Sequence, residues 1–137
     1  IHSGDWSSDV CSSDLGEIVP CDEFYSYKAK YIDDDSDLLI PAPIDEDMIE
    51  RIRALAVRAY TAIDCAGMAR VDFLLDRESG ELFLNEINTI PGFTRISMYP
   101  KLWDASGLPY TELMEELVRL AFERHAQKSE LKRKFGE

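Results

Sequence analysis

The sequence predicts an α+β fold in which an antiparallel sheet packs with helices. Residues 69–76 alternate between apolar and polar side chains, and residues 82–88 are predicted to form a second strand. The residues between them are typical of a turn, so the two strands are expected to form an antiparallel hairpin. Residues 45–64 and 111–121 carry apolar side chains at helical spacing, which predicts two amphipathic helices.

Residues 1–15 differ in composition from the rest of the chain. They hold five serines and three aspartates without a helical or strand period. Residues 5–15 (DWSSDVCSSDL) resemble the translation of a sequencing-library adapter, so we expect residues 1–15 to be a non-native leader. A natural disordered leader is the alternative. Residues 16–45 are expected to be loop-rich and to end in an extended form.

The first helix is predicted to begin after Asp45 and to run to about residue 64. Aspartate is a preferred N-cap because its side chain accepts hydrogen bonds from the first backbone N–H groups of a helix. Apolar residues recur behind it at three- and four-residue steps and form one stripe. The members of the stripe are Met48, Ile52, Leu55, Ala59, Ala62 and Ile63.

Further elements are expected after the second strand. Pro91 opens a loop, residues 97–105 are predicted to form a short helix, and Thr111 is predicted to N-cap the last helix. Residues 125–137 are rich in charge and are expected to form a frayed, solvated tail. The buried stripe of the last helix is expected to contain Leu113, Met114, Leu117, Val118 and Ala121.

Composition argues against several classes of function. The net charge of −12 opposes binding to nucleic acid, which needs clustered Lys and Arg. No apolar run reaches the length of a membrane span, so no membrane partner is expected. The three cysteines form no CxxC pair and the two histidines lie far apart, which argues against a zinc site and fits a reducing cytosol.

Polar residues of the predicted hairpin form the candidate site. In the register that the apolar pattern favours, Asp72 lies opposite Glu86 and Arg70 lies opposite Asn88 on one face. Facing carboxylates repel each other unless a proton or a cation lies between them. Oxygen ligands without His or Cys suit Mg²⁺ or Mn²⁺, whose shells water and substrate phosphates complete, so we expect a metal–nucleotide ligand. A polar strand face with an Arg–Asp ion pair is the alternative.

The same register makes two further predictions about the hairpin. Leu82 and Leu84 are expected on the face of Glu86 and Asn88. On the other face, Val71, Phe73 and Leu75 are expected to oppose Ile87, Asn85 and Phe83.

A longer string around these residues resembles the D-alanine–D-alanine ligases of the ATP-grasp superfamily. The resemblance is carried by residues 69–73 (ARVDF), 83–94 (FLNEINTIPGFT) and 97–103 (SMYPKLW). Residues 24–31 (FYSYKAKY) are similar to the active-site loop of that family. The resemblance covers residues 16–124 and implies the C-terminal ATP-grasp region of such a ligase, as a partial domain.

The resemblance implies roles in phosphate and metal binding. Asp72, Glu86 and Asn88 are similar to the ligands of two Mg²⁺ or Mn²⁺ ions that hold the β- and γ-phosphates of ATP. Lys30 resembles the loop lysine that reaches the transferred phosphate. Tyr31 resembles the loop tyrosine that ties the closed lid to the N-terminal domain.

The resemblance also implies roles in binding the amino-acid substrates. Arg70 and the backbone N–H of Gly92 are similar to the donors that hold the developing oxyanion. Ser97, with the N–H of Met98, resembles the group that binds the carboxylate of the second D-alanine. A helix N-terminus favours an anion at such a place.

The reaction that the resemblance implies has two steps. ATP phosphorylates the carboxylate of one D-alanine, and the amine of a second D-alanine then attacks the acyl phosphate. The products are D-alanyl-D-alanine for peptidoglycan precursors, phosphate and ADP. The resemblance further implies a cytoplasmic enzyme that is a homodimer when complete.

We expect this chain to be inactive alone. The family's N-terminal substrate-binding domain and most of its nucleotide-clamping segment have no counterpart in the sequence. Two alternatives remain at this point, namely another ATP-grasp carboxylate–amine ligase and a non-catalytic metal- or nucleotide-binding fragment.

Overall fold

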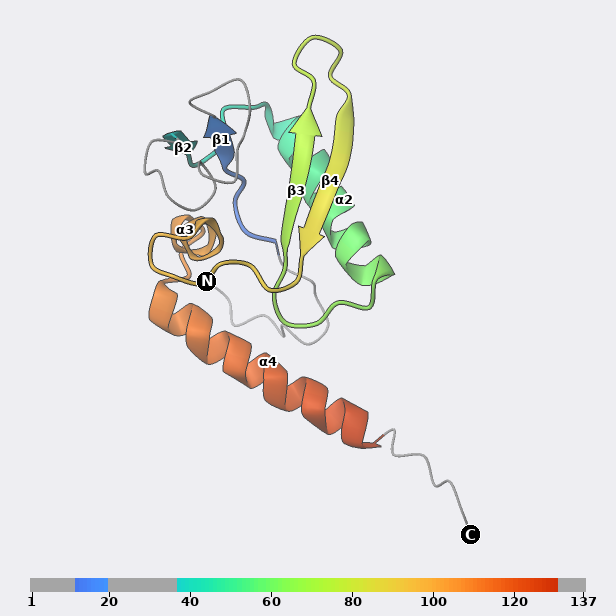
Figure 1. Cartoon of the computed structure of the whole chain (residues 1–137), viewed down its shortest axis with the longest axis vertical. Coiled ribbons are helices and arrows are strands. Elements are labelled where there is room, and N and C mark those ends of the chain that lie inside the picture. Colours follow the sequence, from blue (N-terminus) through green and yellow to red (C-terminus); the bar gives the residue numbers. More distant parts are fainter. Residues whose placement is uncertain (1–11, 20–36, 131–137) are drawn as a thin grey trace.

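The computed structural model describes residues 12–19 and 37–130. These residues form two antiparallel two-stranded sheets and three helices, so the predicted α+β class is confirmed (Figure 1). The elements are β1 (Glu17–Val19), β2 (Asp37–Leu39), α2 (Glu46–Ala62), β3 (Arg70–Leu75), β4 (Leu82–Asn88), α3 (Met98–Ala105) and α4 (Tyr110–Glu130).

Two short strands lie in the segment that was expected to be loop-rich. β1 pairs antiparallel with β2, and Glu17 lies opposite Leu39. Each strand has only three residues, too few for alternation to show in the sequence. Glu17 also forms an ion pair with Arg77 in the turn between β3 and β4. This pair attaches the small sheet to the larger hairpin.

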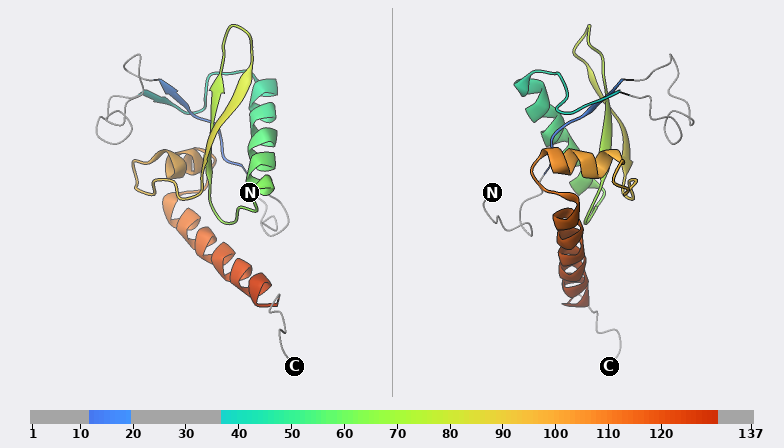
Figure 2. Two further views of the ribbon diagram at one scale, coloured as in Figure 1. Left: turned by 45° about the vertical axis from the view of Figure 1, so that its right-hand side comes forward. Right: turned by 90° about the vertical axis from the view of Figure 1, so that its left-hand side faces the viewer.

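Helix α2 confirms the predicted N-cap. Asp45 Oδ1 accepts a hydrogen bond from the backbone N–H of Met48 at 2.8 Å. The helix ends at Ala62, two residues before the expected end. It lies along β3 (Figure 2), and its Ile52 is buried.

The β3–β4 hairpin contains a bulge that the sequence analysis did not predict. The pairs Arg70–Asn88, Val71–Ile87 and Asp72–Glu86 follow the expected register, but Phe73 pairs with Leu84. Asn85 is therefore an extra residue on β4, and every pair beyond it is shifted by one.

The bulge reverses the face of the outer half of β4. Leu82 and Leu84 pair with Leu75 and Phe73, so they lie on the face opposite Glu86. The prediction that these two leucines share a face with Glu86 and Asn88 is wrong, as is the predicted pairing of Phe73 with Asn85. Leu84 and Ile87 are three residues apart, so strict alternation would place them on opposite faces of the strand. The extra residue, Asn85, allows both side chains to lie on the same face.

Helix α4 differs from its prediction at both ends. It begins at Tyr110, and Leu113 N donates to the carbonyl of Pro109, so Thr111 lies inside the first turn and is not the N-cap. The helix continues to Glu130, so residues 125–130 are helical and do not form an irregular tail.

The burial of α4 also differs from the prediction. Leu113 is 2% exposed, whereas Met114 and Val118 are 46% and 56% exposed. Helix α4 packs against α3 and then extends past the hairpin (Figure 1). Its apolar stripe is therefore only partly covered by the described residues.

The described part of the chain has a thin core. Its buried residues include Ala42, Ile52, Tyr99 and Leu113, together with Pro91 and Pro100. A cavity of about 600 Å³ lies among α2, β3, α3 and α4. No described helix combines the length and the apolar character of a membrane span.

The described end of the leader contacts the rest of the chain. Asp14 forms an ion pair with Arg53 at 2.6 Å, and the Leu15 carbonyl accepts from Ala42 N at 2.8 Å. The non-native origin of residues 1–15 stays a prediction.

Candidate functional site

Residues of β3 and β4 bring the predicted polar cluster together. Arg70 lies opposite Asn88 and Asp72 lies opposite Glu86, so the four side chains share one face of the hairpin. They lie on the side of the bulge where the predicted register holds. The predicted meeting of the two carboxylates is confirmed.

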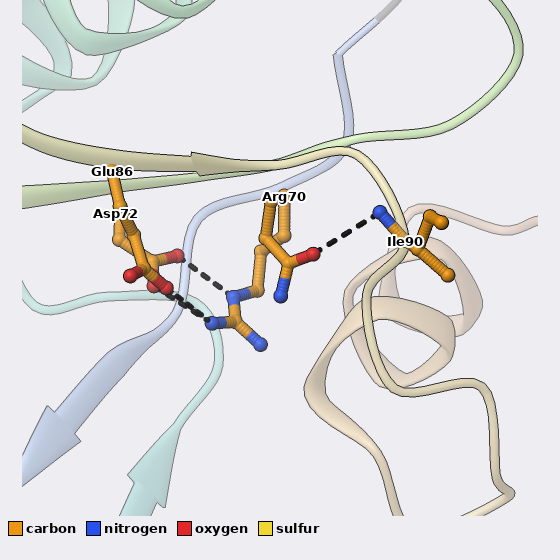
Figure 3. A network of polar contacts seen from close by, with 5 residues as sticks. Arg70, Asp72, Glu86 and Ile90 are labelled. Atoms are coloured by element: carbon orange, nitrogen blue, oxygen red, sulfur yellow. Dashed lines mark hydrogen bonds and ion pairs between the residues drawn. The ribbon is translucent and has the colours of Figure 1, made fainter.

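The guanidinium of Arg70 balances both carboxylates (Figure 3). Its Nε and Nη2 donate to Oδ1 and Oδ2 of Asp72, each at 2.8 Å. Nη2 also donates to Oε1 of Glu86 at 3.2 Å. Fork-like contact between Arg and a carboxylate fixes direction as well as charge, so Asp72 orients the guanidinium plane. The Arg70 side chain is 18% exposed, which limits screening by solvent.

Asn88 connects the hairpin to the loop that follows it. Its Oδ1 accepts a hydrogen bond from the backbone N–H of Ile90 at 3.1 Å (Figure 3). This contact turns the chain sharply at the end of β4, as short amide side chains often do. The Asn88 side chain thereby connects the end of β4 to the start of the loop 89–97.

The loop 89–97 folds back so that Gly92 approaches Ser97. A Cβ added to Gly92 would lie 3.1 Å from Ser97 Oγ. Ser97 is the N-cap residue of α3 in backbone conformation, but its side chain makes no hydrogen bond to that helix. Ser97 Oγ instead accepts from Thr94 N at 3.0 Å and lies 2.7 Å from Thr94 Oγ1. Gly92 thus lies next to Ser97 at the N-terminus of α3, which begins at Met98.

Thr94 is a candidate residue that the sequence analysis did not single out. The signal that could have found it is a threonine three residues before a serine that caps a helix, a spacing typical of local side-chain hydrogen bonds.

Aromatic residues support this loop from behind. The ring of Phe93 lies 5.9 Å from that of Tyr99 and 5.3 Å from that of Tyr110, measured between centroids. The Tyr110 hydroxyl donates to the Phe93 carbonyl at 3.2 Å. Burial raises the pKa of Tyr99 to about 12, so this phenol is neutral at physiological pH and acts in packing.

The chemistry of the donors suits a hard divalent cation. Among the described residues there is no group of three or more His, Cys, Asp and Glu side chains that could hold a metal ion. The hairpin face offers two carboxylates and one amide oxygen, and Mg²⁺ usually takes only one or two protein carboxylates. Asp72, Glu86 and Asn88 therefore fit a metal ion whose remaining ligands come from phosphate and water. Lys30 and Tyr31 lie outside the described residues.

Comparison with known families gives a match over most of the chain. The family model described as "D-ala D-ala ligase C-terminus" matches residues 5–119. The chain is 57% identical over 116 residues to a D-alanine–D-alanine ligase of Ruminiclostridium cellulolyticum, covering 83% of this chain and 31% of that protein. It is 58% identical over 118 residues to a D-alanine–D-alanine ligase of Thermoanaerobacter sp., covering 85% and 33%. The chain thus spans about a third of the length of these relatives.

Solved structures give the same result for the fold. The D-alanine–D-alanine ligase of Coxiella burnetii superposes with a TM-score of 0.67 at 43% identity, over 70% of this chain and 27% of that one. The VanG D-Ala:D-Ser ligase of Enterococcus faecalis superposes with a TM-score of 0.70 at 36% identity, over 82% and 33%.

Proposed function

This chain belongs to the family of D-alanine–D-alanine ligase C-termini, and on that premise we propose that it is the C-terminal part of an ATP-dependent ligase. The enzyme joins two D-alanines through an acyl phosphate to give D-alanyl-D-alanine for peptidoglycan precursors. The observation that carries the proposal is the cluster of Arg70, Asp72 and Glu86 beside Asn88 on one hairpin face. A carboxylate becomes a good electrophile only after a phosphate leaving group is attached. The site therefore has to neutralise the negative charge of the transferred phosphate.

Asp72, Glu86 and the amide oxygen of Asn88 are the residues that would hold two Mg²⁺ or Mn²⁺ ions. Such ions supply neutralisation of the ATP β- and γ-phosphates when bound. Arg70 already contacts the same carboxylates, so a metal ion and the guanidinium compete for their oxygens. The contact of Arg70 with Glu86, at 3.2 Å, is longer than its two contacts with Asp72, at 2.8 Å, so the guanidinium holds Glu86 less closely than Asp72.

Arg70 and the backbone N–H of Gly92 would donate to the oxyanion that forms when the amine attacks. Donors oriented in advance stabilise such charge without reorganisation at the moment of reaction. Asp72 provides this orientation by its paired contacts with the guanidinium. Lys30 is proposed to reach the transferred phosphate, and Tyr31 to tie the closed loop to the N-terminal domain.

Ser97 and the N–H of Met98 would bind the carboxylate of the second D-alanine. The first turn of α3 favours an anion there, and the Ser97 side chain does not occupy that turn's N–H groups. D-serine is a second candidate for this substrate, because the similar protein of Enterococcus faecalis is a D-Ala:D-Ser ligase. The higher identity to D-alanine–D-alanine ligases favours D-alanine.

The complete enzyme is proposed to be a cytoplasmic homodimer whose partners are the small molecules ATP and D-alanine. The net charge of −12 supports the absence of a nucleic-acid partner. No membrane partner is proposed.

The test is an assay of a complete ligase that carries this chain as its C-terminal part. ADP release and dipeptide formation are measured with D-alanine alone and with D-alanine plus D-serine, at several Mg²⁺ and Mn²⁺ concentrations. The proposal expects metal-dependent D-alanyl-D-alanine as the main product. Formation of D-alanyl-D-serine as the main product would mean that D-serine, and not D-alanine, is the second amino-acid substrate. ADP release that does not depend on D-alanine or D-serine would contradict the proposed ligase activity.

A further inference from the structure

The surroundings of Ser97 Oγ point to a residue that prepares it for binding. The backbone N–H of Thr94 donates to Ser97 Oγ at 3.0 Å, and Thr94 Oγ1 lies 2.7 Å from the same atom. Gly92 closes a third side, because a Cβ there would lie 3.1 Å away. The Ser97 hydroxyl is therefore held between Thr94 and the backbone of Gly92.

Counting donors shows what this arrangement leaves for a ligand. A hydroxyl has one proton to donate and two lone pairs that accept. The Thr94 N–H uses one lone pair of Ser97, and the contact between the two hydroxyls uses one of their two protons. One hydroxyl proton remains whichever way that contact runs. A carboxylate next to Ser97 can only accept, so it selects the state in which Thr94 donates to Ser97 and Ser97 donates outward.

We propose that Thr94 is a positioning residue that holds the Ser97 hydroxyl as a donor for the carboxylate of the second amino-acid substrate. The inference rests on the proposed function, because it assumes that Ser97 binds this carboxylate. Thr94 itself acts through Ser97. Its hydroxyl donates to the second lone pair of Ser97 Oγ, so both lone pairs are used. The Ser97 proton is then directed toward the substrate carboxylate.

The backbone of Thr94 is itself held in place. Phe93 packs against Tyr99 and Tyr110, and the Tyr110 hydroxyl donates to the Phe93 carbonyl. Ser97 N also donates to the Thr94 carbonyl at 2.9 Å, so Thr94 and Ser97 contact each other through backbone and side chain. Thr94 is exposed, so these contacts and not burial hold its side chain against Ser97. A serine that only capped its helix would direct its oxygen to the first-turn N–H groups, which Ser97 does not do.

The experiment compares Thr94→Val, Thr94→Ser, Ser97→Ala and the double variant Thr94→Val/Ser97→Ala in a complete ligase. Valine keeps the shape of threonine and removes the hydroxyl, whereas serine keeps the hydroxyl. Thr94→Val removes the hydroxyl that directs the Ser97 proton, so the hydrogen bond from Ser97 to the charged carboxylate is weakened and KM for the second D-alanine should rise about tenfold. The kcat at saturation and KM for ATP should stay within about twofold, and Thr94→Ser should restore KM for the second D-alanine.

Two further measurements separate positioning from a loss of structure. D-alaninamide has no carboxylate, so the preference for D-alanine over D-alaninamide should fall in Thr94→Val and in Ser97→Ala. Ile96→Ala is the matched control, because Ile96 is exposed beside Ser97 and should leave this preference unchanged. Thr94→Ala replaces Thr94→Val if the latter fails to fold.

The outcomes distinguish this inference from the proposed function. If Thr94 acts through Ser97, Thr94→Val should add almost nothing once Ser97 is alanine. An equal effect of Thr94→Val in both backgrounds, or an unchanged KM in Thr94→Val while Ser97→Ala raises it, would overturn the role of Thr94 alone. A wild-type enzyme that forms no dipeptide, or Ser97→Ala with unchanged KM, would instead overturn the role assigned to the site.

Discussion

The hairpin face and the loop 89–97 adjoin at Asn88, yet they are built in different ways. On the hairpin, charged side chains hold one another across two strands, with Arg70 between Asp72 and Glu86. In the loop, a backbone N–H, two hydroxyls and a missing Cβ fix one another around Ser97. The first region is suited to phosphate and metal charge and the second to one carboxylate, while Arg70 and the Gly92 N–H contribute one donor each to the proposed oxyanion. The comparison teaches that the two regions should respond to different substitutions.

The largest effect is expected from Glu86→Gln in a complete ligase. Glutamine keeps the shape and removes the charge that faces Asp72, so one of the two charged ligands proposed for the metal ions is lost. Turnover should fall roughly 100-fold or more, with a higher Mg²⁺ requirement. Asn88→Ala is the comparison variant and should cost roughly tenfold. The measurement is ligase rate against Mg²⁺ concentration, and a near-normal rate with an unshifted Mg²⁺ dependence in Glu86→Gln would refute the metal assignment.

Arg70→Met separates the two proposed roles of the guanidinium, as a donor to the oxyanion and as a competitor of the metal ion for the carboxylates. Losing an oxyanion donor should reduce kcat roughly 100-fold. Losing a competitor for the carboxylates should leave Mn²⁺ binding as tight as in wild type or tighter, because Asp72 and Glu86 then repel each other until a cation binds. Calorimetric titration with Mn²⁺ tests this without reference to activity. Weaker Mn²⁺ binding in Arg70→Met would show that the guanidinium supports the metal site and does not compete with it.

Gly92→Ala tests the loop without touching any charge. The new Cβ would press on Ser97 Oγ, so KM for the second D-alanine should rise about tenfold while the Mg²⁺ requirement stays unchanged. Gly80→Ala is the matched control, because Gly80 lies in the hairpin turn at φ +70 with nothing near its missing Cβ. It should cost about 1 kcal/mol of stability through backbone strain and leave that KM unchanged. Equal kinetic effects of the two variants would mean that the loop responds to general destabilisation.

The hairpin could be predicted from sequence further than the loop could. Strict alternation placed Arg70 and Asp72 on one face, and the register favoured by the apolar pattern placed Glu86 and Asn88 opposite them. That register is wrong next to the turn, where Leu82 pairs with Leu75, and it holds at Glu86 only because of the bulge. The bulge at Asn85 was missed because local alternation does not show which apolar residues need to share a face. Thr94 was missed because its importance depends on a loop whose path has no period.

The helices show a related limit. The apolar spacing of α4 correctly predicted a stripe, with Leu113 buried, but Met114 and Val118 are about half exposed. Periodicity identifies the face of a helix and says nothing about what covers it. The start of α4 was misplaced because Tyr110, one residue before Thr111, already has helical backbone after Pro109. The first backbone hydrogen bond of the helix runs from Leu113 N to the Pro109 carbonyl, two residues before the expected cap.

The smallest effect is expected from Tyr110→Phe, which tests how far the support of the loop extends. The variant keeps the ring that lies 5.3 Å from Phe93 and removes only the hydroxyl that donates to the Phe93 carbonyl. A lost neutral hydrogen bond should cost about 1 kcal/mol, expressed mainly as faster amide hydrogen exchange in residues 89–97. KM for the second D-alanine should change by no more than about twofold, because Thr94 and Ser97 still hold each other. Tyr60→Phe is the matched control, since its hydroxyl donates to the Gly67 carbonyl at 3.4 Å, next to α2, and its loss should leave exchange in the loop unchanged. A tenfold rise in KM for Tyr110→Phe would contradict this prediction, because it would mean that the Thr94–Ser97 contacts do not hold the loop in place without the Tyr110 hydroxyl.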